Sequence, residues 1–165
     1  MSPTAPEPIA AHHVLAGFDS GQPTLDNWLT ARALRNERDG ASRTYVVCDD
    51  GAVVAYYCLA AGSVQHRDVP GRVRRNMPDP IPVMLMGRLA VAGSHQGKGL
   101  ARGLVRDAVL RTLKAAEIAG IRALLVHALD ENAATFYRHL GFLESPVDPL
   151  VLALPVAAAR KLLDP

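Results

Sequence analysis

Gln96-Gly97-Lys98-Gly99-Leu100-Ala101 is the stretch of sequence that decides the fold. It follows the apolar run over residues 83–92 and opens a long amphipathic segment. Glycines let the backbone approach an anion closely, and the first turn of a helix offers N–H groups that have no internal partner. The helix dipole adds a partial positive charge at the same end. A strand, a glycine-rich turn and a helix start therefore predict a loop that binds phosphate groups.

The spacing of this loop excludes the two best-known nucleotide motifs. The residues around Gly97 and Lys98 do not fit the Walker pattern Gly-x-x-x-x-Gly-Lys-Ser/Thr. The dinucleotide pattern Gly-x-Gly-x-x-Gly is also not met, because Arg102 stands where its third glycine would be. What remains is Gln-x-x-Gly-x-Ala, which resembles the acyl-CoA pyrophosphate loop of the GCN5-related N-acetyltransferases (the GNAT superfamily). The resemblance implies that acetyl-CoA is a co-substrate, bound by Gln96, Gly97, Lys98, Gly99, Leu100, Ala101 and Arg102.

Length and composition favour one globular domain. The chain has 165 residues, of which 49% are hydrophobic and 21% are charged. No apolar run approaches the roughly 20 residues that a membrane span requires, and the first residues lack the basic region of a secretory signal. We expect a flexible N-terminus over residues 1–10, a domain over residues 11–165, a cytoplasmic location and no membrane association.

Cysteine and arginine usage adds two expectations. Cys48 and Cys58 flank a predicted hairpin that turns near Asp50-Gly51, which would separate them by about 17 Å and exclude a disulfide. We therefore expect two buried thiols. The net charge is only +2, but 15 of the 18 basic residues are arginine, a bias that suits phosphate binding without deciding it.

Hydrophobic periodicity and turn residues predict an α/β or α+β domain with a mixed central sheet and flanking helices. The first helix is expected to begin at a cap provided by Thr24 or Asp26 and to end near Gly40. A proline-rich break covers residues 65–82. The predicted strands are 11–15, 44–49, 53–64, 83–92, 123–128, 142–144 and 150–154, and the further helices are about 100–120, 132–139 and 156–163.

Two more segments resemble the GNAT superfamily. Arg88-Leu89-Ala90-Val91 is similar to the strand whose backbone pairs with the pantetheine arm, so Leu89, Ala90 and Val91 are expected to bind acetyl-CoA in a splayed cleft of the sheet. The run Asn132-Ala133-Ala134-Thr135-Phe136-Tyr137, followed by Leu140-Gly141-Phe142, is similar to the short helix of the family. It implies that Asn132 and Phe136 also bind the co-substrate. An alternative for Asn132 is that it caps this helix.

Tyr137 is the candidate catalytic residue. Acetyl transfer from a thioester needs a proton for the leaving thiolate, and a phenol with a pKa of about 10 is close enough to a thiol to supply one. The alternative is that Tyr137 only packs on the short helix. The strand over residues 83–92 contains no Asp or Glu that could act as a base. An α-amino group with a pKa of about 7.7–8.0 needs little such help, whereas a lysine side chain does.

The resemblance extends to the GNAT toxins of bacterial toxin–antitoxin pairs. It rests on Phe18-Asp19-Ser20-Gly21, Leu25-Asp26-Asn27-Trp28-Leu29 and Val126-His127-Ala128-Leu129-Asp130, among other segments. It implies a homodimer that acetylates the amino acid on charged tRNA, blocks translation and is neutralised by a DNA-binding antitoxin of the ribbon-helix-helix type. Two alternatives remain open: a GNAT enzyme acting on a small amine or a protein N-terminus, and a non-catalytic acyl-CoA-binding module.

Seven arginines are candidates for binding tRNA phosphates. Three lie on the first predicted helix, three lie in the proline-bounded segment, and one lies in the central strand; they are Arg32, Arg35, Arg38, Arg72, Arg74, Arg75 and Arg88. A solvated helix face and a loop are the alternatives for the first six, whereas Arg88 would be costly to bury without a phosphate or carboxylate partner. The six histidines show no metal-binding spacing, so no metal site is expected. The identity of the aminoacyl group stays open.

Overall fold

The computed structural model describes residues 2–163 and the side chains up to Lys161. Within this range no helix combines the length and the apolar character that crossing a membrane would take. The described residues gather into two compact units. The first takes the chain up to Ala60 together with Gly87–Ala108, and the second takes Ala61–Met86 together with the chain from Val109.

The predicted hairpin is confirmed in the first unit. β2 (Arg43–Asp49) and β3 (Ala52–Val64) pair antiparallel, with Cys48 opposite Val53. Asp50 and Gly51 connect them at φ 54° and φ 82°. Two successive left-handed residues form the turn whose twist matches that of a β-hairpin. Both cysteines are buried and free, as expected.

The N-terminal segment differs from the prediction. β1 (Glu7–Pro8) pairs antiparallel with β2, and the Thr4 N–H donates to the Cys48 carbonyl over 2.8 Å. Residues 4–9 are thus held by β2, where a flexible stretch was expected. The predicted strand over residues 11–15 is wrong, because the Ala10 N–H and the His13 ring close a tight turn. Only an isolated bridge from Val14 to Ala52 remains there.

The first predicted helix is divided into three parts. They are α1 (Pro23–Trp28), the wide π-helical turn η1 (Leu29–Ala33) and α2 (Leu34–Asp39). The N-cap is Gln22 and not Thr24 or Asp26, because Pro23 takes the first helical position, which suits its fixed φ. The Asp26 carboxylate instead accepts a 2.6 Å hydrogen bond from the Ser20 hydroxyl.

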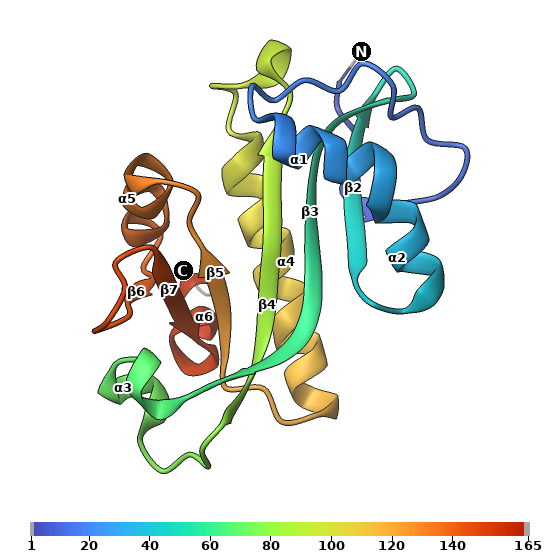
Figure 1. The fold of residues 1–165 in the computed structure, drawn as a ribbon. Helices are drawn as coiled ribbons and strands as arrows, with labels where there is room; N and C mark the ends of the chain where they lie inside the picture. The colour runs from blue at the N-terminus through green and yellow to red at the C-terminus, as the bar shows by residue number, and fades with distance from the viewer. Residues whose placement is uncertain (1, 164–165) are drawn as a thin grey trace. The chain divides into compact units, whose positions relative to one another are not determined.

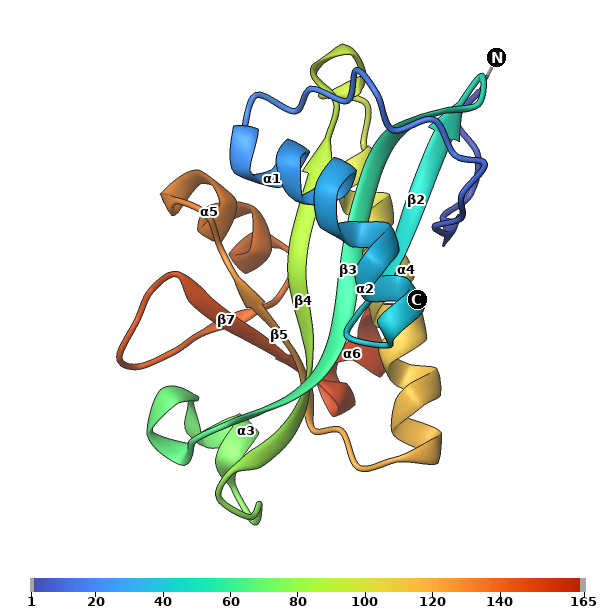
Figure 2. The same cartoon turned by 45° about the vertical axis from the view of Figure 1, so that its right-hand side comes forward.

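Consecutive tyrosines of β3 hold helices on its two faces within the first unit, because neighbouring strand residues point to opposite faces. The Tyr56 hydroxyl donates to the Leu25 carbonyl over 2.6 Å, and its ring stacks with Trp28. The Tyr57 hydroxyl donates to the Asp107 carboxylate in α4 (Leu100–Ile118). In Figures 1 and 2, α1 and α2 accordingly run beside the β2–β3 hairpin.

The mixed sheet is also confirmed, with the strand order β1-β2-β3-β4-β5-β7-β6 in the described residues. β4 (Ile81–Val91) pairs in parallel with β5 (Ala123–His127), through Met84–Met86 and Leu124–Val126. β7 (Val151–Pro155) pairs antiparallel with β5, and β6 (Leu143–Glu144) pairs antiparallel with β7.

The second unit has its own apolar core. It is built from Val69, Val73, Ile81, Val83, Ala123, Leu125 and Ala153. Val69 and Val73 come from the predicted proline-rich break, which contains the short helices η2 (His66–Asp68) and α3 (Gly71–Arg74). The unit also contains α5 (Glu131–His139) and α6 (Val156–Leu163), close to the predicted bounds.

Replacing Gly40 by Ala tests the C-cap of α2. Gly40 has φ 76°, and a Cβ atom there would meet no heavy atom within 4 Å. The substitution should therefore cost only the left-handed strain, about 1 kcal/mol of the free energy of unfolding measured in urea. Gly71→Ala is the matched control, because its surroundings are equally open and its φ is not left-handed. Equal effects of the two substitutions would contradict this explanation.

Candidate functional site

The glycine-rich loop has the backbone that an anion site requires. Gly97 has φ 78° and Gly99 has φ 84°, values that residues with a Cβ rarely adopt. The Gly103 N–H donates to the Gly99 carbonyl over 3.1 Å, the first helical bond of α4. The amides of Leu100, Ala101 and Arg102 lie in the turn before this bond, where a helix has no internal acceptors to offer them.

Space and charge around the loop suit a diphosphate. A Cβ atom added to Gly97 or Gly99 would meet no heavy atom within 4 Å, so a ligand can approach the backbone at both positions. Lys98 and Arg102 are exposed, and the first turn of α4 carries no acidic residue. The 19-residue helix adds its positive end at the same place. The loop therefore fits the diphosphate of a CoA molecule.

The Gln96 side chain is engaged with the protein itself. Its Nε2 donates to the Val91 carbonyl over 2.9 Å and to the Ser20 carbonyl over 3.0 Å. His95, one residue earlier, is also held: its Nε2 lies 2.8 Å from an Asp49 carboxylate oxygen. These contacts fix the start of the loop between the end of β4, the segment before α1 and the end of β2. Sequence reasoning missed them because two of the three partners, Ser20 and Asp49, are distant in the chain.

The strand that precedes the loop is largely buried. Leu89 is half-buried, and Ala90 and Val91 are buried. Beyond them the Ala92 N–H donates to the Val54 carbonyl of β3 over 2.8 Å. Because little of these side chains is exposed, a ligand would meet this segment mainly through its backbone.

The other predicted co-substrate residues lie on α5 in the second unit. The N-cap of this helix is Asp130, whose carboxylate accepts from the Ala133 N–H over 2.9 Å. The alternative role of Asn132 as the cap is therefore wrong, since Asn132 is the second helical residue and is exposed. Phe136 is half-buried, with its ring 5.2 Å from that of Tyr137.

Tyr137 is buried by aromatic rings, yet its hydroxyl has no partner in residues 2–163. The residue is 7% exposed, and its ring contacts Phe136 edge-to-face and Phe142 at a tilt, with ring centroids 5.2 and 5.3 Å away. No hydrogen bond joins its hydroxyl to a described residue. Burial raises the pKa of the Tyr137 phenol above its ordinary value, so the group stays protonated. This is a proton donor with nothing in the described chain to donate to.

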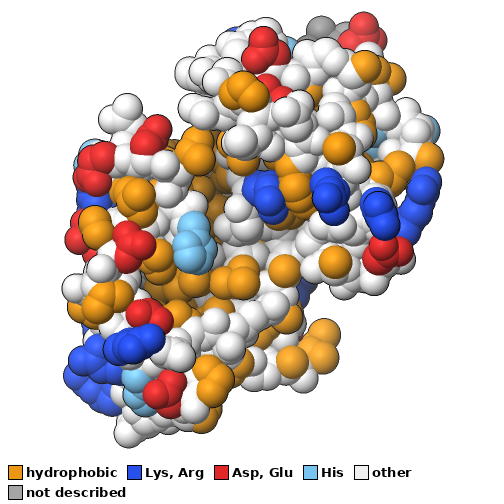
Figure 3. All heavy atoms as spheres, viewed as in Figure 1, with side chains coloured by type: hydrophobic (Ala, Val, Ile, Leu, Met, Phe, Trp, Pro, Cys, Tyr) orange, Lys and Arg blue, Asp and Glu red, His pale blue; other side chains and the backbone are white. Residues whose placement is uncertain are grey.

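Three of the predicted arginines form an exposed row in the first unit. Arg32, Arg35 and Arg38 lie on η1 and α2 with their side chains in solvent. Arg35 has a loose ion pair with Asp39 at 4.0 Å, which contributes little because both groups are exposed. Figure 3 shows Lys and Arg side chains in a row over the surface where these helices run. The row is able to bind phosphates.

Arg88 has an aromatic partner. Its guanidinium carbon lies 4.5 Å from the centre of the Trp28 ring, and Trp28 in turn stacks with Tyr56 at 5.9 Å. Burial raises the pKa of the nearby Cys58 thiol, and the charge of Arg88 opposes that shift. The expected phosphate or carboxylate is thus replaced, within the described residues, by the face of an indole ring.

The arginines of the proline-bounded segment have different surroundings. Arg74 Nη1 donates to the Val69 carbonyl over 2.6 Å, which commits its side chain to its own segment. Arg72 and Arg75 instead line a groove of about 480 Å³ in the second unit, together with Arg122 and Arg160. Arg122 was not predicted. Its Nε and Nη2 donate to the Val73 and Arg72 carbonyls over 2.9 and 3.1 Å, and so close the end of α3.

One group of possible metal ligands occurs in residues 2–163, formed by Glu7, His12 and His13. Both ring nitrogens of His13 already have protein partners. Nδ1 accepts from the Ala10 N–H over 2.9 Å, and Nε2 lies 2.8 Å from a Glu7 oxygen. The cluster is a folded turn around a buried histidine, and none of the residues proposed from the sequence belongs to it.

Comparison with known proteins identifies similar chains. A family model described as "Acetyltransferase (GNAT) domain" matches residues 40–144. The chain is 52% identical over 160 residues to a curated tRNA-acetylating toxin of Mycobacterium tuberculosis, covering 97% of this chain and 96% of that protein.

Two solved structures are similar in fold to this protein over nearly the whole chain. AtaT complexed with acetyl-methionyl-tRNAfMet has a TM-score of 0.90 and 30% identity, over 98% of this chain and 99% of that one. A tyrosine-to-phenylalanine mutant of the AtaT toxin, bound to the C-terminus of the antitoxin AtaR and to acetyl-CoA, has a TM-score of 0.85 and 30% identity, with both chains fully covered.

Proposed function

Because the chain belongs to the GNAT acetyltransferase family, we propose that it transfers an acetyl group from acetyl-CoA to the α-amino group of aminoacyl-tRNA. By this reaction it blocks translation as the toxin of a toxin–antitoxin pair. The observation that carries the proposal is the 52% identity to a tRNA-acetylating toxin over 97% of the chain. The likeness to AtaT complexed with acetyl-methionyl-tRNAfMet supports the same acceptor.

Acetyl-CoA supplies an activated acetyl thioester when bound. Its diphosphate is held by the loop amides at Gly97 and Gly99 and by the first turn of α4, with Lys98 and Arg102 balancing charge. In the first unit, the backbone of β4 at Leu89, Ala90 and Val91 would hold the pantetheine arm. In the second unit, Asn132 and Phe136 of α5 are the proposed co-substrate residues.

Tyr137 holds a proton on its hydroxyl oxygen and gives it to the departing thiolate. Two observations support this role: the hydroxyl makes no hydrogen bond to a described residue, and burial keeps the phenol protonated. The Phe136 and Phe142 rings fix the orientation of the phenol, so the proton is presented in one direction.

Charged tRNA is bound through arginines on both units. Arg32, Arg35 and Arg38 serve in the first unit, and Arg72 and Arg75 serve in the second. Arg88 presents a guanidinium already oriented by Trp28. Arg74 belongs to the same proposed set, and one of its N–H groups also donates to the Val69 carbonyl.

The proposal extends to partners and location. AtaT binds the C-terminus of its antitoxin AtaR. By analogy, a DNA-binding antitoxin of the ribbon-helix-helix type neutralises this protein, which acts as a homodimer in the cytoplasm where aminoacyl-tRNA is found.

Incubation with labelled acetyl-CoA and a pool of charged tRNAs tests the function directly. Label should enter the RNA fraction and should leave it as N-acetyl-amino acid after mild alkaline hydrolysis of the ester. Parallel reactions contain deacylated tRNA, small amines and peptides with free N-termini. Label in the amines or peptides alone would favour a small amine or a protein N-terminus as the acceptor and would contradict the tRNA acceptor. If the tRNA is labelled, the N-acetyl-amino acid released from it identifies the aminoacyl group.

Tyr137→Phe tests the acid. The ring packing is kept and only an unpartnered hydroxyl is lost, so stability should hold while kcat falls by about 10²–10⁴. Tyr57→Phe is the matched control, because it removes a hydroxyl that does bond to Asp107 and should lower stability with little effect on kcat. Turnover of Tyr137→Phe within a few-fold of the wild type would exclude Tyr137 as the acid.

Gly99→Arg tests the loop. The side chain would fill the open space beside the Gly99 backbone and cover the amides of the first turn, so acetyl-CoA binding measured by calorimetry should disappear. Gly99→Ala carries the same left-handed strain without the bulk and should bind more weakly than the wild type but measurably. Near-native affinity in a folded Gly99→Arg protein would contradict the loop assignment.

Salt dependence of tRNA binding tests the arginines. Replacing Arg72 and Arg75 by Ala should make the slope of log Kobs against log salt shallower by about 0.7–0.9 for each lost phosphate contact. Replacing Arg32, Arg35 and Arg38 should act likewise, and acetyl-CoA binding should not change. Arg106→Ala with Lys114→Ala is the control, since both are exposed charges of α4. Equal slopes in all variants would mean that the arginines are only a solvated surface.

A further inference from the structure

His127 occupies the end of β5, and strand alternation decides which way it faces. Side chains two positions apart lie on the same face, so His127 shares a face with Leu125. Leu125 pairs with Leu85 in β4, and His127 pairs with Val151 in β7. The sheet therefore places an imidazole at the edge of a patch of three aliphatic side chains.

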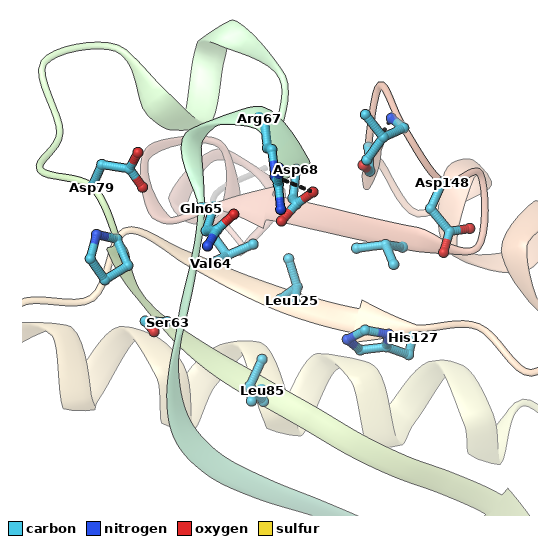
Figure 4. Close-up of a pocket in the computed structure, with 14 residues that line it drawn as sticks. Ser63, Val64, Gln65, Arg67, Asp68, Asp79, Leu85, Leu125, His127 and Asp148 are labelled. Carbon is cyan, nitrogen blue, oxygen red and sulfur yellow. Dashed lines mark hydrogen bonds and ion pairs between the residues drawn. The ribbon is translucent and has the colours of Figure 1, made fainter.

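This patch is the floor of a large cleft in the second unit. The cleft has a volume of about 970 Å³ and is lined by Leu85, Leu125, His127 and Val151 from the strands. The segment Ser63–Asp68 supplies one wall, and the segment between β6 and β7 supplies another through Ser145, Val147 and Asp148. Figure 4 shows His127 and Asp148 facing the space above Leu125, with Arg67 and Asp68 on its other side.

The charged groups of the cleft favour a cation. Asp68, Asp79 and Asp148 line it, whereas Arg67 is the one lysine or arginine in its lining. Arg67 lies 4.0 Å from an Asp68 oxygen. Asp79 accepts the backbone N–H of His66, and Asp148 accepts the backbone N–H of Leu150. Two carboxylates thus lack a countercharge among the described residues, and the cleft attracts an ammonium group.

The His127 imidazole is available to such a group. Three other histidines are engaged by hydrogen bonds: His13 with Glu7, His66 with the Met77 carbonyl and His95 with Asp49. In contrast, His127 is exposed, and no hydrogen bond or ion pair joins its ring to a residue in the range 2–163. A ring nitrogen that faces the cleft can accept a proton, and histidine is the side chain most often used as a general base.

We propose that this cleft receives the aminoacyl group of the acceptor and that His127 is a catalytic residue, the base that takes a proton from its α-ammonium group. The inference rests on the proposed function. One N–H bond of the ammonium breaks, its electron pair stays on nitrogen as the nucleophile, and a ring nitrogen of His127 binds the proton. The imidazolium then releases this proton to water, so the base is restored for the next turnover.

The acidic lining explains why a base is useful for this acceptor. An α-amino group with a pKa of about 7.7–8.0 is partly neutral in water, but nearby carboxylates stabilise its charged form. The same groups that attract the ammonium therefore hinder its loss of a proton. An imidazole at the edge of the apolar floor offsets this hindrance, and the floor itself accommodates the side chain of the amino acid.

His127→Ala tests the proposal, with His139→Ala as the control because His139 is also exposed and does not line the cleft. At pH 7, kcat for aminoacyl-tRNA should fall by about 10–100-fold in His127→Ala, at or below the lower limit of what a general base contributes, because an α-amine needs only modest help. KM should stay within about two-fold. The loss should be larger at pH 7 than at pH 8.5, where more of the amine is already neutral, and at pH 7 added imidazole should restore part of kcat in His127→Ala alone.

A second measurement is independent of turnover. Puromycin, an aminoacyl nucleoside with a stable amide bond, should shift the His127 ring signals in NMR spectra of the wild type and leave those of His139 unchanged. Unchanged His127 signals with saturating puromycin, or wild-type kcat in His127→Ala, would overturn the proposal. Failure of the wild type to acetylate any charged tRNA would instead overturn the proposed function, so the two failures are distinguishable.

Discussion

Side chains alternate between the two faces of β3 and of β5, because successive Cβ atoms point to opposite sides of a strand. In β3 this constraint sends Tyr56 to the Leu25 carbonyl before η1 and sends Tyr57 to Asp107 in α4, so one strand anchors two helices. In β5 it aligns Leu125 with His127 over the cleft of the second unit. A shift of register by one residue would exchange these faces and remove both arrangements.

Local signals made much of the fold predictable from the sequence. Asp50-Gly51 fixed the hairpin because few residue pairs tolerate two left-handed positions in succession. The loop was predictable because Gly97 and Gly99 each take a left-handed conformation that residues with a Cβ rarely adopt. The first helix was less predictable: its start and end were close to the observed ones, yet its division by the π-helical turn η1 has no local signature. The β1 strand was missed because its two residues are polar or proline and depend on β2.

Long-range hydrogen bonds explain what sequence reasoning could not supply at the candidate site. Gln96 reaches the Ser20 carbonyl, 76 positions away, and Arg122 reaches the Val73 carbonyl, 49 positions away. A side chain that donates to a distant carbonyl has no spacing rule that would reveal its partner. The sequence indicated that Arg88 needs a partner but did not reveal the Trp28 ring, whose face lies 4.5 Å from the guanidinium carbon. Sequence thus identified residues under constraint more reliably than it identified their partners.

Sequence reasoning about a catalytic base was also incomplete, because it did not include the surroundings of the amine. β4 carries no carboxylate, and an α-amine is easier to deprotonate than a lysine side chain, so the residues alone argued that no strong base was needed. That argument treats the amine as if it were in water. Three carboxylates and one arginine in the lining of the cleft change its environment, and they come from segments that lie far apart in the sequence. Binding the ammonium well and deprotonating it easily are then opposed, since the same field stabilises the charged form. An imidazole on an apolar floor resolves the opposition, because a base of this kind removes the proton without adding negative charge to the cleft.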